Sequence, residues 1–218
     1  MTAKLPPTAS VAEPREGAKQ SAPAALRNVS ALTNLLGRIA PRSGHALELA
    51  SGTGQHVVAF AAALPHLTWH PSEIAADRRA SIEAYRMEAG LPNLRPVQNL
   101  NACAPGWGVL ADPQDLILCI NLLHLIPDQA AQTVITEAAI ALASGGTLLL
   151  YGPFKRDDLL TSDGDVRFDA QLRAADPEIG YKDKSDIAAW LGKAGLVVAQ
   201  TVDMPANNLA FIARKSPV

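Results

Sequence analysis

The stretch Glu48-Leu-Ala-Ser-Gly-Thr-Gly-Gln-His56 joins a short apolar run to a helical pattern. Gly52 and Gly54 allow a tight turn and a close approach of the backbone to a ligand, and the N-terminus of the following helix favours an anionic group. Two turn glycines also occur in α/β proteins that bind nothing there, so the loop alone leaves both interpretations open. Glu48 lies in an otherwise apolar strand. A buried carboxylate needs a partner, and a ligand ammonium would provide one.

Apolar runs and helical patterns alternate on both sides of this stretch. The expected strands are residues 45–50, 67–73, 94–100, 116–121, 147–151, 196–202 and 209–213. The expected helices are residues 24–39, 55–64, 77–89, 127–142, a short one near 170–175, and 186–193. The runs LILCI and TLLLY do not alternate between apolar and polar residues, which is typical of parallel strands that are covered by helices on both faces.

The order of these elements predicts an α/β fold. Repeated βα units form an open, doubly wound, mostly parallel sheet with right-handed crossovers. Only the short segment 203–208 separates the last two expected strands, too few residues for a parallel crossover, so they form an antiparallel hairpin. We therefore expect seven strands, a terminal antiparallel hairpin and an extra N-terminal helix. In such a sheet, ligands bind outside the carboxyl ends of the parallel strands.

Composition favours one domain preceded by a tail. The chain has 218 residues, of which 48% are apolar and 18% charged, which is enough for a core. Residues 1–20 show no hydrophobic periodicity and are expected to be a flexible arm before a single domain of residues 21–218. The formal net charge is -2 without a Lys/Arg cluster, so we expect no nucleic-acid partner and no membrane partner. Because we find neither a signal peptide nor a long apolar run, we expect a cytoplasmic protein.

The residues needed for several other kinds of site are missing from the sequence. Cys103 and Cys119 are too few for a disulfide scaffold or a zinc cage. His66 and His70 are four residues apart, but Pro65 and the strand that follows argue against a helical metal pair, so no metal is expected. Neither a G-x-S-x-G nor a G-x-x-x-x-G-K-S/T pattern occurs.

A second acid supports a nucleotide-like ligand. Glu73 ends the second expected strand, 21 residues after Gly52. A carboxylate at this place can accept both hydroxyls of a ribose, although it could also be an ordinary solvated group. A dinucleotide fingerprint would want a third glycine at position 57, where this chain has Val57. A nucleotide-dependent oxidoreductase is therefore the weaker alternative.

An acid, a small-residue loop and a second acid resemble class I S-adenosylmethionine-dependent methyltransferases. Their usual loop is E/D-x-G-x-G-x-G, and here Ala50 occupies the first glycine slot, where we expect little steric cost. The segments SAPAALRN, ELASGTGQH, HPSEI, LPNLRPVQNLNA, CINLLHLIP, LLLYGPF and MPANNL resemble a methyltransferase-like family catalogued as domain of unknown function 938. This resemblance covers nearly all of residues 21–218. It implies the strand order 3-2-1-4-5-7-6 and the cofactor S-adenosyl-L-methionine.

The resemblance also implies where the cofactor lies. Glu48 would lie near its ammonium, Glu73 would bind the ribose, and Ile74 would pack on the adenine face. Asn101 takes the slot that often holds an Asp reading the adenine amine, and Asn121 would lie beside the sulfonium. The remaining expected cofactor-binding residues are Ala50, Ser51, Gly52, Thr53, Gly54 and Ala102.

Methyl transfer requires alignment of a nucleophile and removal of any proton it carries. His124 is the leading candidate base because histidine titrates near neutrality, but it could equally orient a loop or cap a helix. Tyr151 could hydrogen-bond a substrate or close over the sulfonium, or it could be a core tyrosine. These two residues are the candidate catalytic residues.

Polar residues elsewhere could hold the methyl acceptor. Arg27 could bind a substrate carboxylate or be a solvated helix charge, and Arg173 is a second option of the same kind. The two asparagines of the expected hairpin loop could bind polar groups, although Asn is common in turns. The candidate substrate-binding residues are Arg27, Asn28, Phe154, Arg173, Asn207 and Asn208.

The sequence therefore predicts methyl transfer to an O, N or S atom of a small molecule. The chain reads Asn-Leu-Leu-His after the fourth expected strand rather than N/D-P-P-Y/F, so the usual signature for methylating a base amine is missing. A small-molecule acceptor fits the lack of basic patches and of a protein-docking extension. A non-catalytic cofactor-binding protein remains an alternative, and the expected assembly is a monomer or homodimer.

Overall fold

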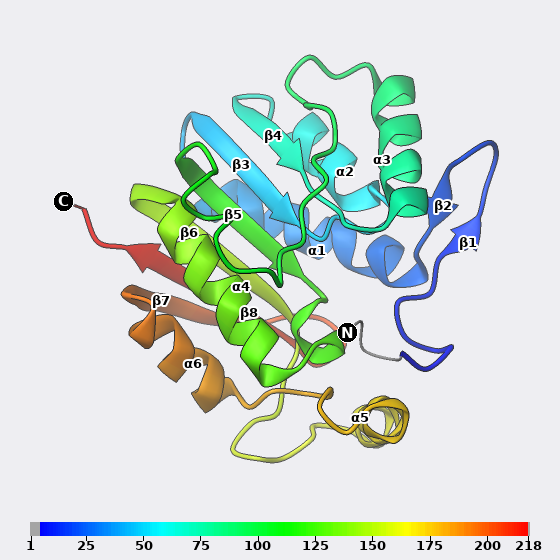
Figure 1. Cartoon of the computed structure of the whole chain (residues 1–218), viewed down its shortest axis with the longest axis vertical. Helices are drawn as coiled ribbons and strands as arrows, with labels where there is room; N and C mark the ends of the chain where they lie inside the picture. Colours follow the sequence, from blue (N-terminus) through cyan, green and yellow to red (C-terminus); the bar gives the residue numbers. More distant parts are fainter. Residues whose placement is uncertain (1–4, 218) are drawn as a thin grey trace.

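The computed structural model describes residues 5–217, and Figure 1 shows one sheet with helices on both faces. The helices are α1 (Pro23–Ile39), α2 (Gln55–Ala63), α3 (Ala76–Ala89), the 3-10 turn η1 (Leu123–Leu125), α4 (Asp128–Ala141), α5 (Asp163–Ala175) and α6 (Lys184–Lys193). The strands are β1 (Glu13–Pro14), β2 (Gln20–Ser21), β3 (Gly44–Leu49), β4 (Leu67–Pro71), β5 (Gln114–Ile120), β6 (Leu142–Pro153), β7 (Leu196–Asp203) and β8 (Asn208–Lys215).

The main sheet has the strand order β4-β3-β5-β6-β8-β7. Strands β4, β3, β5 and β6 are parallel, whereas β8 is antiparallel to both β6 and β7. The prediction of a mostly parallel α/β sheet with a terminal antiparallel hairpin is confirmed, and α1 is the extra N-terminal helix. Residues of α1 and α2 pack on one face of the sheet, and residues of α4 and α6 pack on the other. The parallel strands end at one edge, called here the carboxyl edge.

The prediction of seven strands is wrong, because residues 94–100 do not form one. They run parallel to β4 but touch it only through two isolated bridges, Trp69 with Leu94 and Ser72 with Gln98. Pro96 interrupts the segment and Pro71 ends β4. Proline has no backbone N–H to donate, so neither residue can complete the ladder of hydrogen bonds. The sheet therefore has six strands, flanked by an extended segment.

Helix α5 is longer than the short helix expected near residues 170–175. Its N-cap Ser162 accepts a hydrogen bond from the backbone N–H of Asp165, and acids fill its first turn. Only Leu172 among its apolar residues is fully buried. The hydrophobic periodicity was therefore too weak to indicate the full length of the helix. Its beginning is set by the N-cap Ser162.

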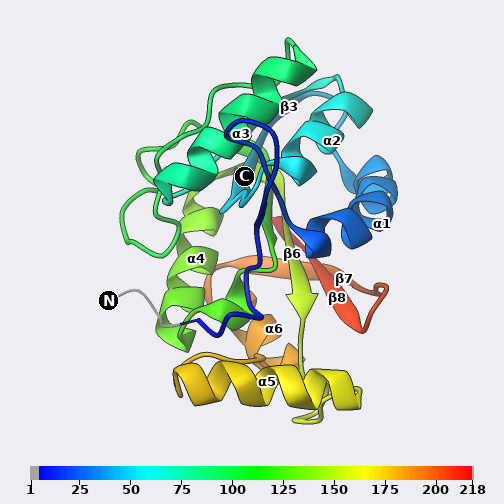
Figure 2. The same ribbon diagram turned by 90° about the vertical axis from the view of Figure 1, so that its right-hand side faces the viewer.

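Residues before α1 lie along the carboxyl edge. The strands β1 and β2 form a small antiparallel hairpin, and Figure 2 shows the N-terminal segment passing between α5 and α3 in front of the sheet. That residues 1–20 are a flexible arm stays a prediction, and residues 1–4 lie outside the described part. No helix within residues 5–217 has the length and apolar character needed to cross a membrane.

Candidate active site

The loop after β3 has an unusual backbone. Ala50, Gly52 and Gly54 have φ angles of 50°, 59° and 92°, in the left-handed region that favours glycine. A Cβ atom on Gly54 would lie 2.9 Å from the Cα atom of Ile82, so this residue must be glycine for α2 to pack on α3. The expectation that alanine at position 50 has little steric cost is wrong. In the left-handed conformation its Cβ atom comes too close to the following carbonyl oxygen.

Hydroxyl groups join this loop to the end of β4. The Ser72 hydroxyl donates to the carbonyl of Glu48 at 2.9 Å, and the Ser51 hydroxyl donates to the same carbonyl at 3.2 Å. The backbone N–H of Ser51 donates to the carbonyl of Ser72 at 2.8 Å. The ends of β3 and β4 are thereby fixed relative to one another.

The Glu48 side chain is only 1% exposed, and its Oε2 atom has no hydrogen-bond partner. Burial raises the pKa of this carboxyl to about 8; the nearby Ser51 hydroxyl opposes the rise, and the charge of Glu73 adds to it. A buried carboxyl without a partner, beside a glycine loop, fits a ligand ammonium. The site therefore meets the requirement of the methionine part of the cofactor.

Glu73 differs from Glu48, because backbone groups satisfy it. Its carboxylate accepts hydrogen bonds from the N–H groups of Gly52, Ile74 and Ala75 at 3.0, 2.8 and 3.0 Å. Ile74 next to it is 56% exposed at the carboxyl edge. Glu73 and Ile74 therefore lie next to each other at the carboxyl edge, beside the glycine loop.

The next expected cofactor residues lie in the loops after residue 100 and after β5. Asn101 is exposed, and its side-chain oxygen accepts a hydrogen bond from the Cys103 N–H at 3.0 Å, whereas Ala102 is buried. Asn121 has a φ of 55°, and its N–H donates to the carbonyl of Tyr151 at 2.8 Å. Asparagine tolerates this left-handed conformation better than most residues.

Tyr151 lies on the face of the sheet that α1 covers. Its hydroxyl is buried without a hydrogen-bond partner, and burial raises its pKa to about 12, an effect that the charge of Arg27 opposes. Arg27 is exposed on α1, and the neighbouring Asn28 is buried. His56 on α2 was given no role from the sequence. Its Nε2 atom is buried without a partner, and burial lowers its pKa to about 4.

His124 lies in a group of aromatic rings. Its ring is 5.9 Å from that of Phe168 and 6.0 Å from that of Tyr181, both edge to face. Burial lowers the pKa of His124 to about 3; the charge of Lys182 acts in the same direction, and that of Asp169 opposes it.

Gly152 connects His124 to the cofactor side. A Cβ atom placed on Gly152 would lie 3.8 Å from His124 Nδ1 and 3.7 Å from the Asn121 side-chain oxygen. The structure therefore brings His124 and Asn121 together at the ends of β5 and β6.

The other expected substrate residues are engaged elsewhere. Phe154 is buried on the opposite face of the sheet, edge to face with Phe211. Arg173 pairs with Asp169 at 2.8 Å and lines a separate pocket of about 370 Å³. The structure does not bring these two residues to the loop after β3.

The hairpin asparagines also have partners inside the fold. The Asn207 side-chain amide donates to Asp165 of α5 at 3.0 Å. The Asn208 amide donates to the carbonyl of Pro205 at 2.8 Å. Within residues 5–217 no cluster of three or more His, Cys, Asp or Glu side chains could hold a metal.

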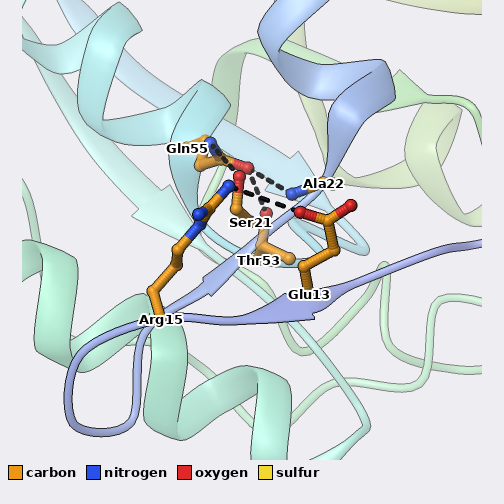
Figure 3. Close-up of polar contacts among 6 residues, drawn as sticks. All are labelled: Glu13, Arg15, Ser21, Ala22, Thr53 and Gln55. Atoms are coloured by element: carbon orange, nitrogen blue, oxygen red, sulfur yellow. Dashed lines mark hydrogen bonds and ion pairs between the residues drawn. The ribbon is translucent and has the colours of Figure 1, made fainter.

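Sequence reasoning missed the link between the glycine loop and the N-terminal segment (Figure 3). Gln55 accepts hydrogen bonds through its side-chain oxygen from the Ala22 N–H at 2.6 Å and from the Thr53 hydroxyl at 3.0 Å. Its amide donates to the Ser21 hydroxyl at 3.4 Å. The position of Gln55 at the start of a helix carried no signal, because its partners in the N-terminal segment, Ser21 and Ala22, are more than thirty residues away in the sequence.

A comparison with protein families agrees with this fold and geometry, and the match covers almost the whole chain. Residues 19–215 match the family described as "Protein of unknown function (DUF938)". The chain belongs to this family. The DUF938 match includes the glycine loop, Glu73 and the terminal hairpin.

Solved structures show that this DUF938 chain has a class I methyltransferase fold. An O-methyltransferase family protein from Burkholderia thailandensis has a TM-score of 0.77 and 19% identity, covering 89% of this chain and 58% of that one. An O-methyltransferase family 2 protein from Planctomyces limnophilus, in complex with apigenin, has a TM-score of 0.74 and 18% identity, covering 88% and 57%. PigF with SAH has a TM-score of 0.68 and 16% identity, covering 86% and 58%. The chain thus spans less than two thirds of each of these proteins.

Proposed function

We propose that this protein is an S-adenosyl-L-methionine-dependent methyltransferase. The observation that carries the proposal is the orphaned, buried carboxyl of Glu48 at the end of β3, beside a left-handed glycine loop. Its surroundings call for a cation, and the methionine ammonium is one. The loop from Ala50 to Gly54 would hold the methionine part, and Glu73 with Ile74 would bind the adenosine. Asn101, Ala102 and Asn121 would complete the cofactor site.

The cofactor supplies a methyl group already activated on a sulfonium, so the chain has to align an acceptor and exclude water. Asn121 and Gly152 border the space in which the acceptor would lie. Tyr151 has a free hydroxyl to donate to an acceptor oxygen, and Arg27 on α1 is close enough for its charge to act on this group. Arg27 and its neighbour Asn28 would bind the acceptor. His124 has a low proton affinity, so as a base it suits an acceptor that is itself acidic.

The acceptor in this proposal is a small molecule with an O, N or S nucleophile. The net charge of -2 and the lack of a Lys/Arg cluster support this class over nucleic acids and membranes. The solved relatives include one described as mitomycin 7-O-methyltransferase, which fits a small-molecule acceptor. We further propose a single domain of residues 21–218 that works in the cytoplasm as a monomer or homodimer.

A non-catalytic cofactor-binding protein is a second candidate. The low pKa of His124 favours it, because a histidine with such weak proton affinity is a poor general base near neutral pH. A nucleotide-dependent oxidoreductase has less support. Val57 occupies the third glycine position of the dinucleotide fingerprint, and its side chain is buried in the core.

A thermal melt with S-adenosylmethionine, S-adenosylhomocysteine or NAD tests the cofactor. A ligand at 100 times its dissociation constant adds about 2.7 kcal/mol, which raises the melting temperature by roughly 5 to 10 °C in a domain of this size. We expect this rise with the two adenosyl compounds. The rise should be lost in Glu73→Ala and kept in the exposed control Glu178→Gln. A rise with NAD alone would contradict the proposal.

A panel of thiols, amines, phenols and carboxylic acids then tests turnover. Formation of S-adenosylhomocysteine with one acceptor class supports the enzyme. In that case His124→Asn should lower kcat without changing cofactor affinity. Tight cofactor binding without turnover on any acceptor would favour the non-catalytic alternative.

A further inference from the structure

The segment of residues 6–11, called here the roof segment, crosses the carboxyl edge of the sheet (Figure 2). It precedes the range that matches the family, which begins at residue 19. Neighbouring residues within it contact opposite sides of the candidate site.

On the acceptor side, the roof segment packs against α5 and the loop that follows it. Ala9 is only 7% exposed and belongs to an apolar cluster with Leu172, Ile179 and Tyr181. The Thr8 hydroxyl donates to the Gln171 side chain at 2.9 Å. Tyr181 is also in ring contact with the candidate base His124, so the apolar cluster that includes Ala9 borders this base.

On the cofactor side, the next residue contacts α3. The Arg78 guanidinium donates to the backbone carbonyl of Ser10 at 2.7 Å and to its hydroxyl at 2.9 Å. The same guanidinium lies over the glycine loop, since a Cβ atom on Gly52 would be 3.4 Å from Arg78 Nη1. One peptide bond thus joins a residue on the acceptor side to a residue on the cofactor side.

The chain that follows the roof segment is anchored to the cofactor loop. The Gln20 N–H donates to the Ser81 hydroxyl at 2.8 Å, and this hydroxyl donates to the carbonyl of Thr53 at 2.8 Å. Gln55 holds Ser21 and Ala22, as Figure 3 shows. The position of the N-terminal segment therefore depends on the loop that would bind the cofactor.

One residue of the roof segment has a strained backbone. Ser10 has a φ of 55°, a left-handed conformation that is unfavourable for serine. Release of Arg78 would relieve this strain and free the segment from α3. The hairpin of β1 and β2 and the anchor at residues 20–22 would remain.

We propose that residues 6–11 form the roof of the methyl-transfer site, so that only a small acceptor fits between this segment and the sheet. This inference rests on the proposed function and identifies the segment that determines acceptor size. The hydrogen bonds between Ser10 and Arg78, called here the latch, have to break before the cofactor can exchange. A side chain of a folded protein or a base within a duplex would collide with the closed roof.

The test uses full-length variants and two probes. One probe is S-adenosylhomocysteine. The other is a sulfonium analogue of the cofactor that carries a benzyl group in place of the methyl group, so that its bulk extends toward the acceptor side. Arg78→Ala opens the latch, and Ala9→Glu places a charge in the apolar contact with Leu172 without touching the cofactor loop. Arg86→Ala at the far end of α3 is the matched control.

We expect wild type and Arg86→Ala to bind S-adenosylhomocysteine and to reject the benzyl analogue. Both roof variants should release S-adenosylhomocysteine about tenfold faster in stopped-flow experiments, and their preference against the benzyl analogue should fall about tenfold. Hydrogen exchange of the backbone amides of residues 8–11 should speed up in both. Circular dichroism verifies that each variant is folded.

If wild type binds S-adenosylhomocysteine and both folded roof variants keep its dissociation rate and selectivity, the roof proposal is wrong and the proposed function stands. If wild type binds neither adenosyl compound, the proposed function fails and the roof proposal falls with it. A change in Arg78→Ala without one in Ala9→Glu would assign Arg78 to the cofactor loop alone, which also overturns the roof.

Discussion

The carboxylate of Glu73 accepts a hydrogen bond from the backbone N–H of Gly52 at 3.0 Å. This contact joins the end of β4 to the glycine loop after β3, across 21 residues of sequence. Two further N–H groups from the start of the next loop bind the same carboxylate. Glu73 therefore has a structural role in the described state, in addition to the ribose contact that we propose.

Glu73→Ala should destabilise the fold as well as abolish cofactor binding. The substitution leaves three partly buried N–H groups without their charged acceptor, which costs about 1–3 kcal/mol in unfolding free energy. Urea denaturation measures this loss. Glu178→Gln, at an exposed position, should change the unfolding free energy by less than about 0.5 kcal/mol. Equal stability of Glu73→Ala and wild type would refute the structural role.

Two glycines of the same loop should respond differently to alanine. In Gly54→Ala the new Cβ atom meets the backbone of Ile82 at 2.9 Å, so α2 and α3 have to separate, and we expect a loss of more than about 2 kcal/mol. In Gly52→Ala the nearest atom is the movable end of Arg78 at 3.4 Å, and the strained φ alone costs about 1 kcal/mol. Chemical denaturation measures the loss of unfolding free energy in both variants. A larger loss in Gly52→Ala than in Gly54→Ala would contradict the close packing of α2 on α3 at Gly54.

Ala50→Gly should stabilise the protein by roughly 1 kcal/mol, because glycine adopts the left-handed conformation without a Cβ penalty. For a chain of this size the melting temperature should rise by about 2–4 °C. The same substitution at Ala80, exposed in the middle of α3, should have the opposite effect, since glycine weakens a helix by about 1 kcal/mol. Calorimetry of both variants measures the difference, and a lower melting temperature for Ala50→Gly would mean that the loop is not strained there.

Glu48 should make stability depend on pH. Its pKa is 4.5 in the unfolded reference and about 8 in the fold, so between these values the native state holds a proton that the unfolded state releases. The contribution of Glu48 to the unfolding free energy therefore falls as pH rises through this window, by up to about 1.4 kcal/mol per pH unit. His56 and His124 act in the opposite direction, because their pKa values are lowered in the fold. Their contribution to the unfolding free energy increases as pH rises toward 6.5.

Glu48→Gln separates these contributions. Its unfolding free energy in urea should therefore rise more steeply with pH than that of wild type between pH 4.5 and 6.5, and it should lack the fall between pH 6.5 and 8. Cofactor affinity of wild type should increase with pH up to about 8 and then level off, because an ammonium prefers the ionised carboxylate. Calorimetry in buffers of different ionisation enthalpy would detect the released proton. A pH-independent affinity would show that Glu48 does not face the ammonium.

Local patterns were sufficient for most of the architecture. The apolar runs of β5 and β6 lie between helices on both faces, and the short connection near residue 205 allows only a hairpin. The residues at strand ends, including Glu48, Glu73 and Asn121, came to one edge because parallel strands all end there. The prediction of a seventh strand was wrong because proline has no backbone N–H. The effect of that missing donor becomes evident only when the neighbouring strand is known.

The sequence by itself determined the order of helices and strands, the glycine loop and the two acids, because each depends on residues close together along the chain. Only the tertiary structure decided that Glu73 is satisfied while Glu48 has an orphaned oxygen, that His124 loses its proton affinity among buried rings, and that Phe154 lies on the far face of the sheet. It also brought Ser10 to Arg78, 68 residues away. Burial, charge and hydrogen bonding at these atoms are set by neighbours from distant segments, which no local pattern contains.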